Sequence, residues 1–314
     1  MIKKINQKIY YYLLPFLLGG ITSFSLPPYN FFLINFLTFP ILLFILIEVQ
    51  KKLNSIWLNF KIGWLFGIGY FLLNIYWIVH SLTFEDIFKP FIPFALVLIP
   101  SFLGLFYGFI TLIVSRFKLK KDLSSILIFS ITFAVIEFIR GFILGGFPWN
   151  LIVYSWANYL NFLQILSIIG TYSLNLISIT IFLFPLLIVF EKKIKFKIFL
   201  LIFLIFTLIC NNYYGLWKIK NDEKFYSEFQ DFKIKIISPK ISIDRFFKYN
   251  NESIIIEELV ELSNPDNLQK TIFVFPEGAL AGVNLDRLKN FKEIFLNKFS
   301  DKHTIIMGIN TERM

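Results

Sequence analysis

T-I-F-V-F-P-E-G-A-L, residues 271–280, is the stretch that indicates an α/β fold in the last part of the chain. The apolar run Ile272 to Phe275 is typical of a short buried strand. Pro276 ends that strand, because proline has no N–H for the ladder. Glu277 follows at once, and α/β folds place reactive groups at such strand ends. The same stretch also fits a strand-end loop with a solvated glutamate, so its surroundings have to decide.

The segments around this stretch alternate between strand and helix patterns. A strand pattern at Phe232–Ile237 and a helical pattern at Glu252–Leu262 precede it. A helical pattern at Leu285–Phe299 and a strand pattern at Thr304–Ile309 follow it. The order β-α-β-α-β predicts an α/β sheet. Three strands would leave this sheet with an unpaired edge and an uncovered apolar face.

The residues before this region have the composition of a membrane protein. The 314-residue chain is 56% hydrophobic, has a mean hydropathy of +0.67 and contains 41 Phe. These values are typical of a polytopic membrane protein, whose helical spans need about 20 apolar residues each. About seven apolar segments approach that length, near 9–25, 30–50, 57–80, 91–114, 123–142, 160–190 and 198–216. We therefore expect a helical membrane bundle over 1–216 and an α/β domain over 217–314.

The net charge of +10 belongs to the hydrophobic part of the chain. Residues 217–314 have 15 basic and 15 acidic residues, whereas residues 1–216 have 16 basic and 6 acidic ones. Fourteen of those 16 fall on one side of the predicted membrane, in the loops around residues 3–8, 51–61, 116–121 and 192–197. The positive-inside rule then places the N-terminus in the cytoplasm and the α/β domain on the opposite, periplasmic side. The charge thus indicates membrane topology and not a nucleic-acid partner.

The connection R-G-F-I-L-G-G-F-P-W-N-L-I-V-Y-S-W, at Arg140–Trp156, is unusual for a loop. It is too apolar for a solvated loop and too rich in Gly and Pro for a stable helix. Non-helical backbone at membrane depth is tolerated only against protein or a cavity. Trp149, Tyr154 and Trp156 are residue types that settle at the headgroup level. We expect a re-entrant or interfacial segment that faces outward; an ordinary aromatic belt is the alternative.

Two further patterns lie within the predicted spans. Glu137 and Arg140 are three residues apart and can pair on one helix face, either as a structural pair or as a contact for substrate. The pairs Gly63-x-x-x-Gly67 and Gly104-x-x-x-Gly108 predict closely packed helices.

The sequence indicates no metal site or cofactor. His80 and His303 have no metal-ligand companion nearby in the sequence. Cys210, the single cysteine, lies in an apolar run, and we expect it to be buried and inert.

Four motifs in this order resemble the apolipoprotein N-acyltransferase family of bacterial lipoprotein maturation. They are F-S-L-P-P-Y-N at Phe24–Asn30, G-W-L-F-G-I-G-Y-F-x-x-x-I-Y-W-I at Gly63–Ile78, R-G-F-I-L-G-G-F-P-W at Arg140–Trp149 and the strand–Pro–Glu unit that ends at Glu277. The resemblance implies a membrane bundle joined to a carbon–nitrogen hydrolase domain, a nitrilase-like αββα sandwich. It also implies the bacterial inner membrane, a phospholipid acyl donor and the α-amine of a diacylglyceryl-cysteine lipoprotein as acceptor.

The resemblance assigns roles to a few residues. The family uses a Cys nucleophile, a Glu general base and a Lys that stabilises the oxyanion. Glu277 matches the general base, and we expect it to be buried beside Phe275 and Ala279. Trp149, Tyr154 and Arg140 are the candidates for substrate contact. The family's Lys and Cys lie in later segments than these 314 residues, so we expect the chain to be C-terminally truncated or one half of a split protein, and inactive alone.

Two other classes of function compete with the acyltransferase. A transporter or channel would need polar residues along the middle of the membrane, and apart from Glu137 and Arg140 the spans supply almost none. A non-catalytic membrane scaffold is the other alternative, favoured by the missing nucleophile.

Overall fold

The chain forms two compact units, Met1–Asn221 (unit 1) and Asp222–Met314 (unit 2). The computed structural model describes residue 7 and residues 9–228, 232–239, 252–280 and 283–311. The helix α10 (Ile194–Glu228) continues from unit 1 into unit 2, so the predicted domain boundary after Leu216 falls inside a helix.

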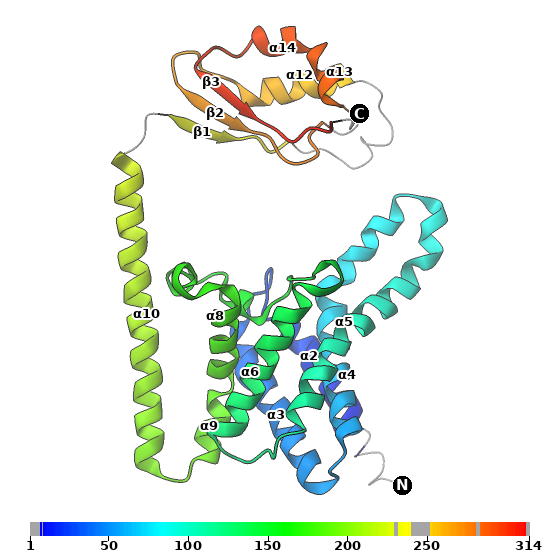
Figure 1. Cartoon of the computed structure of the whole chain (residues 1–314), viewed down its shortest axis with the longest axis vertical. Helices are drawn as coiled ribbons and strands as arrows, with labels where there is room; N and C mark the ends of the chain where they lie inside the picture. The colour runs from blue at the N-terminus through cyan, green and yellow to red at the C-terminus, as the bar shows by residue number, and fades with distance from the viewer. Residues whose placement is uncertain (1–6, 8, 229–231, 240–251, 281–282, 312–314) are drawn as a thin grey trace. The chain divides into compact units, whose positions relative to one another are not determined.

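Unit 1 is a bundle of helices joined by short loops (Figure 1). Its principal helices are α2 (Leu14–Ser23), α3 (Asn35–Lys52), α4 (Ile56–Ile75), α5 (Ile92–Val114), α6 (Leu123–Arg140), α7 (Leu160–Leu163), α8 (Leu166–Phe182), α9 (Phe184–Phe190) and α10. Shorter helical turns are η1 (Ile9–Leu13), η2 (Phe32–Ile34), η3 (Tyr76–Thr83), η4 (Asp86–Phe91), η5 (Ile143–Gly145) and η6 (Ile152–Trp156). Side-chain caps fix two helix starts, because Ser55 accepts a hydrogen bond from the Leu58 N–H and Asp122 accepts one from the Ser125 N–H.

Five of the described helical segments are long and apolar enough to cross a membrane, which confirms a membrane bundle. The bent pair α8–α9 would make a sixth span. The first of the seven expected segments, near 9–25, is a shorter apolar helix in the described residues, Ile9–Ser23. The predicted segment 160–190 is not one straight span either. Gly170 adopts φ 75° inside α8, and Pro185 begins a new helix after a bend of 40°.

The two glycine pairs bring α4 and α5 into close contact, as predicted. A Cβ atom added at Gly67 would lie 2.7 Å from the Cα of Gly104, and one added at Gly63 would overlap the Thr111 side chain. Thr111 donates a hydrogen bond of 2.7 Å from its hydroxyl to the Asn59 carbonyl, which joins the same two helices. Backbone-to-backbone contact of this kind requires glycine at the crossing.

The substitution Gly67→Ala should therefore destabilise unit 1 by about 1–3 kcal/mol, the usual range for overpacking. The change in thermal unfolding of the purified chain in detergent, followed by tryptophan fluorescence, measures this effect. Gly20→Ala is the matched control, because its Cβ would meet the flexible tip of Leu73 at 3.3 Å and the Gly69 carbonyl oxygen at an ordinary contact distance of 3.8 Å, while the gain in helix propensity is the same. Equal stability of the two variants would contradict the close-packing argument.

Unit 2 is a three-stranded parallel sheet with its helices on one face (Figure 1). The strands β1 (Lys233–Ile236), β2 (Thr271–Val274) and β3 (His303–Ile306) lie in the order β1-β2-β3. Helix α12 (Glu252–Ser263) connects the first two strands, and α13 (Leu285–Lys289) and α14 (Lys292–Leu296) connect the last two. This order confirms the predicted β-α-β-α-β pattern, although the predicted single helix over 285–299 is two short helices.

One face of this sheet is packed and the other is bare. Phe273 and Phe275 are buried with Ile256, Leu259 and Val260 of α12 in one apolar cluster. On the opposite face the strand register aligns Ile236 with Val274 and Ile306, and Ile236 is 76% exposed. Among the described residues of unit 2, this apolar face is thus exposed, as predicted. The described residues form one sheet and do not show the second sheet of an αββα sandwich.

Candidate functional site

The connection after α6 is non-helical, as the sequence predicts. Residues 141–151 contain only the short turn η5, and four of them have positive φ angles. They are Leu144, Gly145, Gly146 and Asn150. The backbone reverses at once, since the Phe147 N–H donates a 2.9 Å hydrogen bond to the Arg140 carbonyl. This segment therefore folds back onto the end of the helix that precedes it.

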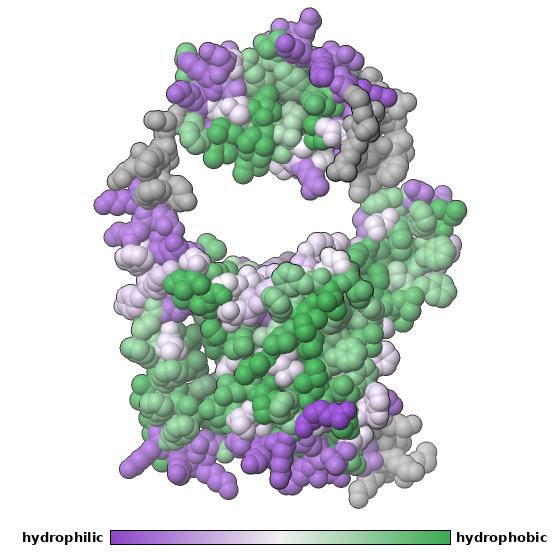
Figure 2. All heavy atoms as spheres, in the orientation of Figure 1, coloured by the Kyte–Doolittle hydropathy of each residue, from purple (hydrophilic) through white to green (hydrophobic). Residues whose placement is uncertain are grey.

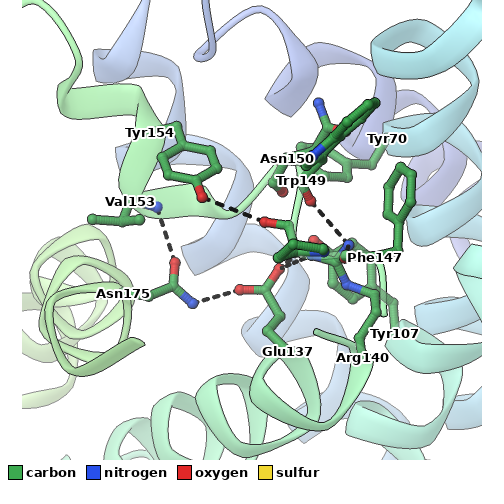
Figure 3. Close-up of polar contacts among 11 residues, drawn as sticks. Tyr70, Tyr107, Glu137, Arg140, Phe147, Trp149, Asn150, Val153, Tyr154 and Asn175 are labelled. Carbon is green, nitrogen blue, oxygen red and sulfur yellow. Dashed lines mark hydrogen bonds and ion pairs between the residues drawn. The ribbon is translucent and has the colours of Figure 1, made fainter. Parts of the chain in front are cut away.

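Glu137 and Arg140 form a buried polar cluster beneath this segment (Figure 3). Both side chains are fully buried, and Arg140 Nη2 lies 3.4 Å from Glu137 Oε1. The Tyr107 hydroxyl donates a 2.9 Å hydrogen bond to the same oxygen, and the Asn175 amide donates to the other one. Each carboxylate oxygen of Glu137 thus has partners, as a buried charge requires.

Arg140 holds the segment through its backbone (Figure 3). Its Nη1 donates hydrogen bonds of 2.6 Å to the Phe147 carbonyl and 2.9 Å to the Trp149 carbonyl. Its guanidinium carbon lies 5.3 Å from the ring centroid of Phe71 and 5.7 Å from that of Phe147, which adds cation–π attraction. Of the two roles that the sequence left open, these contacts favour the structural one for Arg140, because its side chain is inaccessible to a substrate.

Two more side chains hold the same segment. The Tyr70 hydroxyl donates a 2.8 Å hydrogen bond to the Asn150 carbonyl, and Asn175 Oδ1 accepts one of 2.9 Å from the Val153 N–H. Helices α4, α5, α6 and α8 therefore all contribute a side chain to one network. Sequence reasoning missed Tyr70, Tyr107 and Asn175; the available signal was the occurrence of hydrogen-bonding side chains in otherwise apolar spans.

The segment and the turn after it expose four apolar side chains, which we call the loop surface: Phe142, Leu144, Trp149 and Tyr154. Trp149 is 53% exposed and stacks on Trp77, with ring centroids 5.8 Å apart. Trp156, which we expected at the headgroup level, is instead buried and stacks on Phe182. Trp156 lies one 3₁₀ turn after the buried Val153 and shares its inward face of η6, whereas Tyr154 lies on the exposed face.

Cys210 is exposed, so the prediction of a buried thiol is wrong. The reason is that the rest of the bundle does not cover α10: no residue of its most apolar 18-residue stretch is buried. Cys210 lines an apolar groove of about 390 Å³ between α8 and α10, together with residues such as Ile165 and Phe206. No acidic or basic side chain lines this groove, so nothing in its lining can activate the thiol.

Glu277 lies just beyond the carboxyl end of β2, where the sequence places it. Gly278 has φ 72°, and the Ala279 N–H donates a 3.3 Å hydrogen bond to the Pro276 carbonyl, so the chain turns sharply here. Phe275 and Ala279 are buried, but Glu277 between them is exposed. The expected burial is wrong for Glu277 because it occupies the outer part of the turn. In the described part of the chain, no three His, Cys, Asp or Glu side chains are grouped so as to hold a metal ion.

A model of one protein family matches residues 18–182 of this chain, and its description is Apolipoprotein N-acyltransferase N-terminal domain. The matched range contains Glu137, Arg140 and the loop surface.

Curated proteins that bear the name apolipoprotein N-acyltransferase are also similar to the chain. The protein from Brucella melitensis biotype 1 is 30% identical over 277 residues, which is 84% of this chain and 51% of the relative. The one from Brucella suis biovar 1 is 29% identical over 277 residues, again 84% of this chain and 51% of the relative. The one from Rhizobium leguminosarum bv. trifolii is 26% identical over 310 residues, 94% of this chain and 57% of the relative. The chain thus spans about half the length of the curated relatives it matches.

Proposed function

The chain belongs to the apolipoprotein N-acyltransferase family, and we propose that it takes an acyl group from a membrane phospholipid and passes it to the α-amine of a diacylglyceryl-cysteine lipoprotein. By family it is an acyltransferase with several apolar helices able to span a membrane. The proposal adds to this the two substrates and the residues that meet them.

The observation that carries the proposal is the loop surface, an apolar surface whose backbone is held by hydrogen bonds from buried side chains. Both substrates carry long acyl chains, and exposed Trp149 and Tyr154 are residue types that suit the boundary between headgroups and chains. Arg140 and Tyr70 fix the backbone at residues 147–150, so this surface keeps its shape without a bound lipid. A preorganised surface loses less conformational entropy when it binds.

In the proposed reaction Glu277 is the general base. Because Cys210 is the single cysteine of these 314 residues and is not the proposed nucleophile, the attacking thiol has to come from a further segment or a second chain. That thiol attacks the ester carbonyl of the phospholipid, Glu277 accepts the thiol proton, and the lysophospholipid leaves with that proton on its oxygen. The α-amine of the acceptor then attacks the thioester carbon, Glu277 accepts the amine proton, and the thiol re-forms as the C–S bond breaks. Exposure of Glu277 leaves its carboxylate accessible to both substrates. Cys210 is not the proposed nucleophile, because its groove contains no base.

We also propose the orientation and location that the basic residues indicate. The loops with the clustered lysines would face the cytoplasm, and unit 2 would lie on the periplasmic side of the bacterial inner membrane.

A photoreactive amino acid in place of Trp149 tests the proposed function. In membranes that contain a labelled phospholipid, we expect a covalent adduct between position 149 and an acyl chain. We also expect an excess of a diacylglyceryl-cysteine peptide to reduce this adduct, because donor and acceptor chains would share the loop surface.

The matched control is the same photoreactive group at position 57, since Trp57 is also exposed but lies in the first turn of α4, outside the loop surface. Lipid adducts at position 57 should not respond to the peptide. The absence of an adduct at position 149, with efficient crosslinking at 57, would contradict the lipid contact. An adduct at 149 that ignores the peptide would contradict the proposed acceptor.

A further inference from the structure

A second hollow lies at the opposite end of unit 1 from the loop surface. It has a volume of about 730 Å³ and is lined by the end of α3, the start of α4 and the segment between α5 and α6. Helix α6 starts next to this hollow and ends at Arg140, and its 18 residues span about 27 Å at 1.5 Å per residue. That length is close to the roughly 30 Å thickness of a bilayer core. The hollow therefore lies at the level of the lipid headgroups of one leaflet.

The lining of this hollow is strongly basic. Lys51, Arg116, Lys118, Lys120 and Lys121 all contribute to it, and no acidic residue does. Lys121 is paired with Glu48, at 3.2 Å. Among the described residues, the other four make no ion pair, and all four are exposed. Figure 2 shows hydrophilic residues gathered at this end of the bundle, below the apolar helices.

The basic segment is held in place, in contrast to an ordinary charged loop. Gln50 Nε2 donates hydrogen bonds of 3.0 Å to the Ser115 carbonyl and 2.7 Å to the Phe117 carbonyl. Gln50 Oε1 accepts one of 2.8 Å from the Leu119 N–H, so a single side chain fixes three points of the segment. The Lys120 N–H donates a further 2.7 Å hydrogen bond to the Ser125 hydroxyl. The cations are thus presented around a preformed wall.

Apolar side chains border the same hollow. Phe117 is part of its lining and is 48% exposed, and Ile56 also lines it. A phosphate group that binds the cations would leave attached acyl chains beside these apolar side chains. This combination of a basic hollow and an apolar rim fits a lipid better than a free anion.

We propose that this hollow binds the headgroup phosphate of an anionic phospholipid, separately from the acyl-transfer reaction. Arg116 can donate two parallel hydrogen bonds to phosphate oxygens, while Lys118 and Lys120 supply point charges. Basic pockets between membrane helices bind anionic headgroups in this way. The lipid would fix the ends of α3, α4 and α5 in the leaflet.

Native mass spectrometry of the full chain in detergent, titrated with phosphatidylglycerol, tests the proposal. The triple variant Arg116→Gln, Lys118→Gln, Lys120→Gln should lower the affinity for phosphatidylglycerol about tenfold or more. The matched control is Lys292→Gln, Lys298→Gln, Lys302→Gln, which removes the same charge from exposed positions of unit 2 that do not line this hollow and should change the affinity less than twofold. The wild-type chain should bind phosphatidylcholine more weakly than phosphatidylglycerol. The triple variant should bind the two lipids with equal affinity.

Two results would overturn the proposal. An equal loss of affinity in both triple variants would show that net charge, and not this hollow, attracts the lipid. Complete displacement of phosphatidylglycerol by millimolar inorganic phosphate would show that the hollow is a site for free anions and does not recognise the lipid.

Discussion

Replacement of Arg140 by methionine should lower the stability of unit 1 by about 3–5 kcal/mol, the usual cost of removing one partner of a buried ion pair. The variant leaves the Glu137 carboxylate buried with Tyr107 and Asn175 but without a cation. It also removes the two hydrogen bonds to the carbonyls of residues 147 and 149. We therefore expect a lower unfolding temperature together with faster amide hydrogen exchange over residues 147–153.

The double variant Glu137→Gln, Arg140→Met is the control for this argument. A neutral amide at position 137 can still bond with Tyr107 and Asn175, so the double variant should recover part of the lost stability. The single variant Arg140→Lys should not recover the lost stability. One ammonium group cannot reproduce the planar guanidinium fork that bonds to two carbonyls and a carboxylate. Arg140→Met with the stability of the wild type would contradict the stabilising role of the Glu137–Arg140 pair. A double variant no more stable than Arg140→Met would contradict it as well.

The sequence predicted the two-part fold well because its strongest patterns are local. The strand, proline and helix patterns around Glu277 gave the order of unit 2, and the parallel sheet confirms it. Composition identified the bundle, and the glycine pairs identified the contact between α4 and α5. Span lengths were less predictable, since the π-helical turn at Ile9–Leu13 and the left-handed Gly170 interrupt segments that are continuously apolar.

The buried cluster was predictable only in part. The spacing of Glu137 and Arg140 indicated a pair, but its further partners Tyr107 and Asn175 come from two other helices. Tyr70, from a third helix, bonds to the Asn150 carbonyl of the segment above the pair. No local pattern links residues this far apart in the chain. The same limit explains Cys210 and Trp156, whose burial depends on how closely each neighbouring helix packs and not on the apolar character of their own segment.

Replacement of Glu277 by glutamine should lower acyl transfer by about 10²–10⁴-fold, the usual contribution of a general base. Glutamine keeps the shape of the side chain but cannot accept the proton of the attacking group. Because Glu277 is exposed, the substitution should leave the stability of unit 2 within about 0.5 kcal/mol of the wild type. The measurement is transfer of a labelled acyl chain from phospholipid to a diacylglyceryl-cysteine peptide. The protein is isolated from the membranes of its own cells under mild conditions that retain bound partners, because Cys210 is not the proposed nucleophile and the thiol has to come from elsewhere.

Glu293→Gln is the matched control for this loss of activity, since Glu293 is also an exposed glutamate of unit 2 but lies in α14, away from the end of β2. It should transfer acyl groups at the wild-type rate. Lipid adducts at position 149 should form equally in the Glu277→Gln variant, because a general base acts on the reacting atoms and does not bind the acyl chain. Transfer within a few fold of wild type by Glu277→Gln would show that another residue accepts the proton, and loss of the adduct would show that Glu277 acts through lipid binding instead.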